Sequence, residues 1–565
     1  EGFPCWDEQG LWDIQVPGSW KSQFQELKWY DGHAVYLKQF DAPQLPADHE
    51  AFLCFDGALY TAEVIFNGHR LAVHDWGYSA FQVRVTEVLR EHNELFVLVE
   101  NLLKHDRVPG EIEDWMNDGG LINGVKLIYV PVTHIENFRT STRLAADSAV
   151  IDVEIFLAAR DASASEEVTV SVPELNLTGK VIVSAGQSAH VTLSVPRGQI
   201  RLWSPADPKL YRTELKTRFE TISDDIGYRE LKTAGRQILL NGEPIRLYGV
   251  CMHSEFPKTG RTATPEALEK LVAVAKDLGI NFLRCAHYPY AEIFGRALDK
   301  AGILWWEEVP AYWMFHMREE YMTRLATGML EETIRRDWNR ASLAMWSVSN
   351  ECCWRNPENP QEENYAYWRK AAALVRRLDP SRLLTCAEAQ NLTSANTTWD
   401  PSKGDLLSLG AGGTEDKTFR PMHSDEFYHL FDVLAGNCYV GKPGDEREHY
   451  ARYVKLFLPY NKPLMLSEFG SQSLYGDTSP DDRLGSAQRH ITMIEAAYHV
   501  FEELPELTGY APWVLADGRA PIHWSWYNKG TGLFRFGFLN EEWQPKPVYA
   551  TLKNCIAKLK QHFTR

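Results

Sequence analysis

Two carboxylates at the ends of apolar runs indicate what chemistry this chain could perform. Glu351 closes the segment 346–351, and Glu468 lies in the segment 463–470, each beside polar residues or glycine. A buried parallel strand delivers a reactive group to a barrel mouth in this way. Cleaving a glycosidic bond through a glycosyl-enzyme needs a carboxylic acid and a carboxylate about 5 to 5.5 Å apart. Because 117 residues separate the two glutamates, only a closed fold can bring them together.

The size and composition are those of a multidomain globular protein. A chain of 565 residues is too long for one core, and about 150 residues per domain predicts two to four domains. Its 44% hydrophobic and 24% charged residues are ordinary values. The net charge of −17 argues against phosphate backbones and anionic membranes as partners. We therefore expect neither nucleic acid nor a membrane as a partner.

The chain shows no targeting or metal-binding pattern. No apolar run approaches the ~18 residues of a membrane helix, and residues 1–4 lack the features of a signal peptide. This favours a soluble protein of unassigned compartment, in the bacterial cytoplasm or periplasm. The nine cysteines are scattered without paired metal-ligand spacing. We interpret them as small buried residues rather than a metal or redox site, and we predict no metal and no cofactor.

The expected pattern of strands and helices changes twice along the chain. Residues 1–131 have short alternating runs, and Asn67-Gly68 marks a tight hairpin turn, which predicts a β-sandwich. Residues 132–231 have the strand spacing of an immunoglobulin-like sandwich. Residues 232–565 alternate strands with amphipathic helices, as in a (β/α)₈ barrel. A helix beginning after Thr264 and stopped by Gly279 is typical of this part.

A long polar insertion interrupts the barrel pattern after its expected fifth strand. Residues 391–429 are rich in Thr, Ser, Asp and Gly. Loops of that length are usually functional or mobile. We expect this insertion on the active-site face, where Trp399 could stack on a sugar ring.

The sequence resembles glycoside hydrolase family 2 over nearly its whole length. The matching motifs are residues 57–64 with Asn67-Gly68 and 77–81 in the first domain, 202–205 with 210–211 and 227–229 at the join, and 281–289 in the second barrel strand. The resemblance implies an N-terminal jelly-roll β-sandwich, an immunoglobulin-like β-sandwich and a C-terminal TIM barrel. It also implies an exo-acting retaining β-glycosidase that acts on carbohydrate, and many relatives are homo-oligomers.

The resemblance implies roles for both carboxylates, with Glu351 as general acid/base and Glu468 as nucleophile. Elementary chemistry agrees with these roles. The acid needs a raised pKa, which apolar walls and a nearby carboxylate supply, whereas the nucleophile must stay ionised. Trp346 and Trp354 are our candidates for the apolar walls.

The family motifs also identify the groups around the two carboxylates. Arg284 is similar in position to the arginine that contacts the nucleophile, Asn350 to the asparagine that binds the sugar 2-hydroxyl, and Tyr439 to the tyrosine that donates to the nucleophile. The matching pocket residues are His253, His287 and Trp513, although backbone-bonded histidines and a core tryptophan are the structural alternatives. For Glu308 we favour a structural ion pair with a barrel arginine, and a divalent cation there remains open.

The identity of the sugar is predicted less sharply. The length and three-domain plan resemble β-glucuronidases, in which a loop matching Asp114 reaches the substrate from outside the barrel. Asn528 and Lys529 resemble the pair that binds a glucuronide carboxylate, which needs a paired cation when buried. However, residues 532–534 come two positions later than the family pattern requires. Lys529 could therefore equally be a solvated lysine.

Further departures indicate a reshaped pocket. An expected arginine is replaced by residues 521–524, Pro443 stands for a second tyrosine, and Cys251 stands for an asparagine. The alternatives are therefore a β-galactosidase or a furanoside- or pentoside-specific enzyme, such as a galactofuranosidase or an arabinosidase. A carbohydrate-binding protein without turnover and a transglycosylase also remain open.

Overall fold

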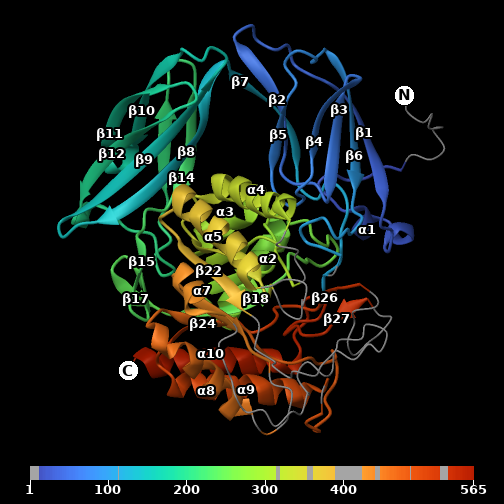
Figure 1. Ribbon diagram of the computed structural model, residues 1–565, viewed down its shortest axis with the longest axis vertical. Coiled ribbons are helices and arrows are strands. Elements are labelled where there is room, and N and C mark those ends of the chain that lie inside the picture. Colours follow the sequence, from blue (N-terminus) through green and yellow to red (C-terminus); the bar gives the residue numbers. More distant parts are fainter. Residues whose placement is uncertain are drawn as a thin grey trace.

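The computed structural model describes residues 12–111, 113–313, 319–352, 361–388, 423–439, 444, 446–483, 485–521 and 532–564. Figure 1 shows two β-sandwiches, in blue and in cyan to green, standing above a barrel built from the rest of the chain. The expected multidomain fold is thus confirmed. The proposed domain boundary at 131/132 follows the strand that ends at Pro131, whereas the proposed boundary at 231/232 falls one residue inside the strand Leu231–Ala234.

The first sandwich pairs a four-stranded sheet, ordered β1-β6-β3-β4, with a three-stranded sheet, ordered β5-β2-β7. Its elements are α1 (Trp20–Gln23), β1 (His33–Asp41), β2 (His49–Phe55), β3 (Thr61–Phe66), β4 (His69–His74), β5 (Phe81–Arg84), β6 (His92–Glu100) and β7 (Val125–Pro131). Between β3 and β4, Asn67 and Gly68 have φ values of 50° and 82°. Positive φ at both positions is typical of a type I′ turn, one of the two common two-residue hairpin turns, so the predicted hairpin is confirmed.

The second sandwich has sheets ordered β12-β9-β8 and β11-β10-β13-β14. Its strands are β8 (Thr133–Leu144), β9 (Ser148–Ala159), β10 (Ser165–Val172), β11 (Leu177–Ser184), β12 (Ser188–Pro196), β13 (Tyr211–Lys216) and β14 (Thr221–Ile226). Along β9 every second residue from Ala149 to Leu157 is fully buried. Because strand side chains alternate between faces, this pattern places one face of β9 in the core.

A small sheet leads into the barrel. It consists of β15 (Leu231–Ala234), β16 (Gln237–Leu240) and β17 (Glu243–Ile245). The barrel strands are β18 (Leu247–Met252), β19 (Phe282–Cys285), β20 (Leu304–Glu308), β21 (Leu343–Asn350), β22 (Leu383–Glu388), β23 (Leu434–Asn437), β24 (Leu464–Glu468) and β25 (Leu507–Tyr510). All neighbours are parallel, and β25 pairs with β18 to close the ring.

Helices surround the barrel. They are α2 (Pro265–Leu278), α3 (Glu292–Ala301), α4 (Glu320–Asp337), α5 (Gln361–Leu378), α7 (Asp425–Leu430), α8 (Glu446–Phe457), α9 (Ala487–Glu503) and α10 (Pro547–Thr564), and a ribbon of β26 (Gly518–Arg519) and β27 (Leu533–Phe534) follows β25. Helix α2 begins as predicted, because the Thr264 side chain accepts from the Ala267 amide, and it ends at Gly279 with φ 72°. No described helix is both long and apolar enough to cross a bilayer.

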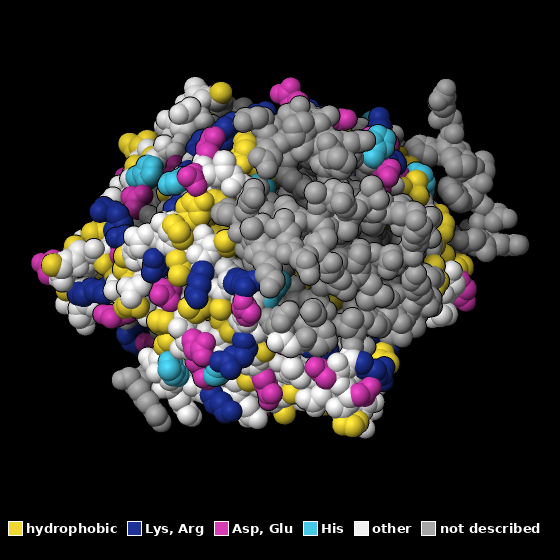
Figure 2. Space-filling model, turned by 60° about the horizontal axis from the view of Figure 1, so that its bottom comes forward, with side chains coloured by type: hydrophobic (Ala, Val, Ile, Leu, Met, Phe, Trp, Pro, Cys, Tyr) yellow, Lys and Arg dark blue, Asp and Glu magenta, His cyan; other side chains and the backbone are white. Residues whose placement is uncertain are grey.

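Basic and acidic side chains are interspersed over the described part of the face shown in Figure 2. The insertion at 391–429 follows β22, the fifth barrel strand, as expected; its residues 391–422, Trp399 included, lie outside the described ranges, so its place on the active-site face stays a prediction.

Candidate active site

Polar side chains gather where the barrel strands end. Arg284 lies in β19, Glu308 ends β20, Asn350 ends β21 and Glu468 ends β24, while Glu351 directly follows β21. The carboxyl ends of parallel barrel strands meet at one edge, where such barrels carry their active sites. The closed fold therefore brings the two sequence-predicted glutamates to the same mouth.

Glu468 is contacted by a cation and a phenol. Nη1 of Arg284 forms an ion pair with Oε1 of Glu468, and Tyr439 donates to Oε2 over 2.8 Å. Beside it, the Cys251 thiol donates to the carbonyl oxygen of Ser467 over 2.9 Å. Charge-assisted hydrogen bonds stabilise negative charge, so both contacts suit a carboxylate that must attack as an anion.

Arg284 is completely buried and links several carboxyl and amide groups. Its Nη2 lies 3.3 Å from Oε1 of Glu308 and donates to Oδ1 of Asn350 over 2.7 Å. Burial acts to lower the pKa of the guanidinium, but Glu308 and Glu468 outweigh it and raise that pKa well above its usual range. The structural ion pair that we expected between Glu308 and a barrel arginine is therefore confirmed.

Glu351 has an unusual backbone and two hydrogen-bond donors. Its φ is 51°, a left-handed conformation that residues other than glycine seldom adopt. Nδ2 of Asn437 donates to Oε1 and Nε1 of Trp313 donates to Oε2, each over 2.9 Å. Desolvation by burial, followed by the charge of Glu468, raises the pKa of Glu351 to about 8, although the two donors act to lower it. Glu351 is thus a carboxylic acid over much of the neutral range.

The expected apolar walls of Glu351 need correction. Trp346 lies in the outer cluster with Val348, and its Nε1 donates to Asp379 over 3.0 Å. Strand side chains alternate, so this face of β21 points to the surrounding helices and not into the barrel. Trp313 contacts Glu351 instead, and Trp354 lies outside the described residues.

Asn437 connects the surroundings of both glutamates, which sequence reasoning missed. Besides Glu351, its Nδ2 donates to Oδ1 of Asn350 over 3.1 Å, and its Oδ1 accepts from the Ser467 hydroxyl over 2.8 Å. The available signal was its position two residues before Tyr439, at the end of β23, since Asn350 and Glu468 also lie at strand ends. A continuous chain of hydrogen bonds therefore runs from the acid to the strand of the nucleophile.

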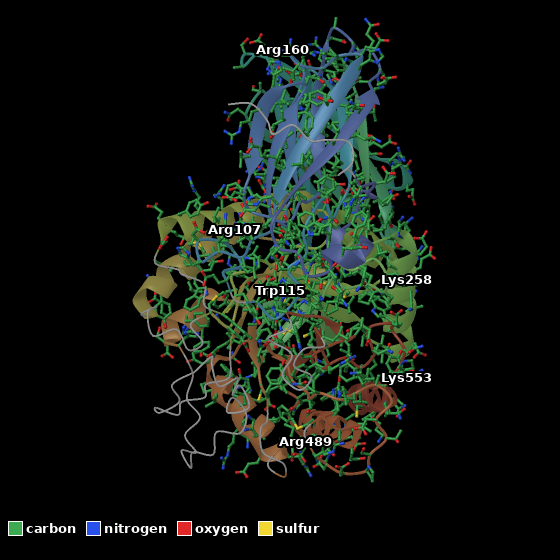
Figure 3. The ribbon with its side chains drawn as sticks, turned by 90° about the vertical axis from the view of Figure 1, so that its right-hand side faces the viewer. Arg107, Trp115, Arg160, Lys258, Arg489 and Lys553 are labelled. Carbon is green, nitrogen blue, oxygen red and sulfur yellow. The ribbon has the colours of Figure 1, made fainter. Side chains whose placement is uncertain are left out.

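A loop of the first sandwich completes the pocket. Figure 3 places Trp115 between the sandwich ribbon and the barrel. Its ring packs edge-on against Tyr312, with centroids 4.8 Å apart, and lies 5.6 Å from the His287 ring. The neighbouring Asp114 lies beside His253 and His287, and its pKa is raised to about 6 by burial and by Glu468, against the lowering effect of His287. The structure therefore brings Asp114 to the barrel histidines, and its contact with the substrate stays a prediction.

Trp513, next to the end of β25, forms an aromatic wall with the two histidines. Its ring stacks on His287 with centroids 5.2 Å apart and meets His253 edge-on at 5.1 Å. Trp513 is 4% exposed, so it is buried beside the pocket and is not a surface platform.

Some of the predicted site lies outside the described residues. This applies to Asn528 and Lys529, and to Pro443 and positions 522–524. The described arginines around the mouth are ion-paired: Arg519 lies 2.7 Å from Asp118 and also pairs with Glu255, and Arg261 lies 3.5 Å from Asp118.

Comparison with known proteins gives matches along most of the chain. Residues 231–479 match the family described as "Glycosyl hydrolases family 2, TIM barrel domain", residues 133–229 match "Glycosyl hydrolases family 2", and residues 17–116 match "Glycosyl hydrolase 2 galactose-binding domain-like". The three matches fall on the barrel, the second sandwich and the first sandwich, in that order.

Individual relatives are distant in sequence, and the length over which they match this chain differs from one to the next. A β-glucuronidase of Paenibacillus borealis is 25% identical over 563 residues, covering 91% of this chain and 87% of the relative. A β-galactosidase of Thermoanaerobacter pseudethanolicus is 25% identical over 362 residues, covering 61% and 47%. The structure of a family 2 β-galacturonidase from Eisenbergiella tayi bound to galacturonate superimposes with a TM-score of 0.83 at 22% identity, covering 96% of this chain and 93% of that one. At that identity the similarity shows a shared fold.

Proposed function

The chain belongs to glycosyl hydrolase family 2 and is a β-glycosidase, and we propose that it is exo-acting and retaining, with Glu351 as acid/base and Glu468 as nucleophile. The observation that carries this assignment is the unequal environment of the two carboxyl groups. Glu468 is bound to Arg284 and Tyr439, whereas the pKa of Glu351 is raised to about 8. Two carboxyl groups with divergent environments are the acid and base pattern of glycosidases.

The first half of the reaction uses both groups at once. Protonated Glu351 donates its proton to the glycosidic oxygen while Glu468 attacks the anomeric carbon. Trp313 and Asn437 orient the acid, and Arg284 and Tyr439 orient the nucleophile. The leaving alcohol departs, and a covalent glycosyl-enzyme remains.

The second half depends on the charge that the first half removes. Once Glu468 is esterified it is neutral, so one of the two effects that raise the pKa of Glu351 disappears. The pKa of Glu351 then falls, and the residue accepts a proton from the attacking water as a general base. The Trp313 and Asn437 donors favour this ionised form.

The terminal sugar is bound by polar groups beneath and beside the glutamates. Asn350, Asp114, His253 and His287 supply hydrogen-bonding atoms, and Trp513 supplies a ring face. Nε2 of His253 and Oδ1 of Asp114 are buried without a hydrogen-bond partner in the described ranges. Buried polar atoms are normally satisfied, so these atoms suit sugar hydroxyl groups.

For the substrate we favour a β-glucuronide. Relatives that match most of this chain and are named β-glucuronidase support this choice, including the one from Paenibacillus borealis. Asn528 and Lys529 would then bind the carboxylate of the sugar. The second candidate is a neutral sugar, because Arg519, Arg261 and Arg284, which the structure describes around the pocket, already pair with protein carboxylates. A buried substrate carboxylate without its own cation would be costly.

Initial rates on a panel of 4-nitrophenyl β-glycosides test the proposal. The panel covers glucuronide, galactopyranoside, galactofuranoside, mannoside and arabinosides, with Glu468→Gln as the inactive control. A glucuronidase loses about 10- to 100-fold in kcat/KM on the glucuronide when Lys529 becomes Met, because a charge-assisted hydrogen bond contributes about 1.5 to 3 kcal/mol. The same variant leaves the galactoside rate unchanged. Equal effects on both substrates would refute a contact between Lys529 and the carboxylate of the sugar. Full activity of Glu468→Gln would refute the role of Glu468 as nucleophile.

A further inference from the structure

Two histidines and an aspartate direct possible ligand atoms at one place in the pocket. One nitrogen of His253, one nitrogen of His287 and one oxygen of Asp114 all lie within 4.8 Å of one another. His253 is 5% exposed and His287 is 1% exposed. These residues come from the sandwich loop and from the ends of β18 and β19, so three separate segments converge there.

Nδ1 of each imidazole already has a partner. Nδ1 of His287 lies 2.7 Å from Oε1 of Glu308, and Nδ1 of His253 lies 3.0 Å from the Tyr288 hydroxyl. Among the described residues, Nε2 of His253 has no hydrogen-bond partner. Histidines that bind metals are arranged in this way, with one ring nitrogen bonded to an outer group and the other left for the ion.

The surrounding charges also favour a cation. Glu308 contacts His287, and Oε1 of Glu468 lies 4.0 Å from Nε2 of His287. Arg284 is the described cation in contact with both glutamates. Asp114 adds a third carboxyl group, so three acidic residues lie around the two histidines against two guanidinium groups, Arg284 and Arg261, whose charges act on His253.

We propose that Asp114, His253 and His287 bind a divalent transition-metal ion such as Zn²⁺. Two imidazoles and one carboxylate are ligands that suit such ions and leave a fourth position open. An ion centred in a triangle with sides of 4.8 Å would lie about 2.8 Å from each corner, so each ligand needs to move by less than about 1 Å to reach bonding distance. The ion coordinates the same side-chain atoms that bind the sugar, so it inhibits hydrolysis by competing with the substrate. This inhibition rests on the proposed function.

Binding of Co²⁺, a spectroscopic substitute for Zn²⁺, tests the site without turnover. The full chain, freed of metals by chelation and desalting, is titrated with Co²⁺ while visible absorption is recorded. Loss of one ligand in His253→Ala weakens binding by at least about tenfold, since even outer-group changes cost 10- to 100-fold. Asp114→Asn, which keeps the side-chain shape, does the same. The matched control His92→Ala removes an imidazole from exposed β6 and binds Co²⁺ as the unaltered chain does.

The outcomes separate the metal site from the proposed reaction. A Co²⁺ spectrum and affinity unchanged in both His253→Ala and Asp114→Asn overturn the site, whatever the activity. Dependence of Co²⁺ binding on His253 supports it even if no glycoside is hydrolysed, in which case the proposed function falls alone. With an active enzyme, Zn²⁺ raises KM and leaves kcat unchanged. Inhibition that lowers kcat at constant KM overturns the competition.

Discussion

The hydrogen bond from Trp313 to Glu351 sets where activity is lost at high pH. Nε1 of Trp313 lies 2.9 Å from Oε2 of Glu351, and Trp313 is 6% exposed. Replacing Trp313 by Phe keeps an aromatic ring and removes the donor. Because that donor favours the ionised carboxylate, the pKa of Glu351 in Trp313→Phe lies above the value of about 8 in the unaltered chain.

The size of the shift follows from the energy of the bond. A hydrogen bond to a charged group contributes about 1.5 to 3 kcal/mol, and one pKa unit corresponds to about 1.4 kcal/mol. The upper bound is therefore about two units. Water near the mouth replaces part of the lost bond, and Asn437 still donates to Oε1. We expect an upward shift of about one unit.

The dependence of kcat/KM on pH measures this shift, because it reports the ionisation of the free enzyme. The acid must be protonated, so activity falls as the pH rises through the pKa of Glu351. In Trp313→Phe this alkaline limb moves to higher pH, while the maximum rate falls because the acid is less well oriented.

Trp346→Phe is the matched control for this measurement. It removes the same indole donor, but from a hydrogen bond to Asp379 in the layer between barrel and helices. Its alkaline limb stays where it is, although the protein unfolds at a lower temperature. An alkaline limb in Trp313→Phe that stays in place or moves to lower pH would refute the reasoning.

Three further changes test other parts of the structure. Glu351→Ala lowers kcat/KM on glycosides with poor leaving groups by about 10²- to 10⁴-fold. On an activated glycoside, added azide partly restores turnover of this variant and is incorporated into a β-glycosyl azide product. The absence of this product would contradict the acid/base role. Asp114→Asn lowers kcat/KM by about 10- to 100-fold, because a contact with the substrate is lost. The melting temperature stays the same, because the fold is kept. A normal kcat/KM would refute a contact between Asp114 and the substrate. Gly532→Ala destabilises the chain by more than about 1 kcal/mol, because Gly532 has φ 67° and an added Cβ would lie 2.1 Å from the Trp29 ring. The control Gly186→Ala, with φ 68° and open space around the added Cβ, shows the cost of backbone strain alone. Equal losses of stability in thermal unfolding would exclude the steric clash with Trp29.

Local signals in the sequence determined the elements and the chemistry they carry. Thr264 and Gly279 set the ends of α2, and Asn67-Gly68 set a hairpin, because caps and turns depend on a few neighbouring residues. The apolar runs ending in Glu351 and Glu468 indicated strands that deliver both glutamates to one mouth. Each of these conclusions needs only the backbone preferences of short segments.

The tertiary structure alone determined which groups bind Glu351 and raise its pKa. No spacing in the sequence indicates that Asn437, at the end of β23, and Trp313, in the segment after β20, would bind the two oxygens of Glu351. Trp346 was the nearer tryptophan, but strand alternation turned it outward. The pKa of Glu351 rises because burial and Glu468 act on it together, and both effects arise only when the barrel closes. Long-range contacts of this kind depend on the relative placement of whole elements, which local sequence patterns do not specify.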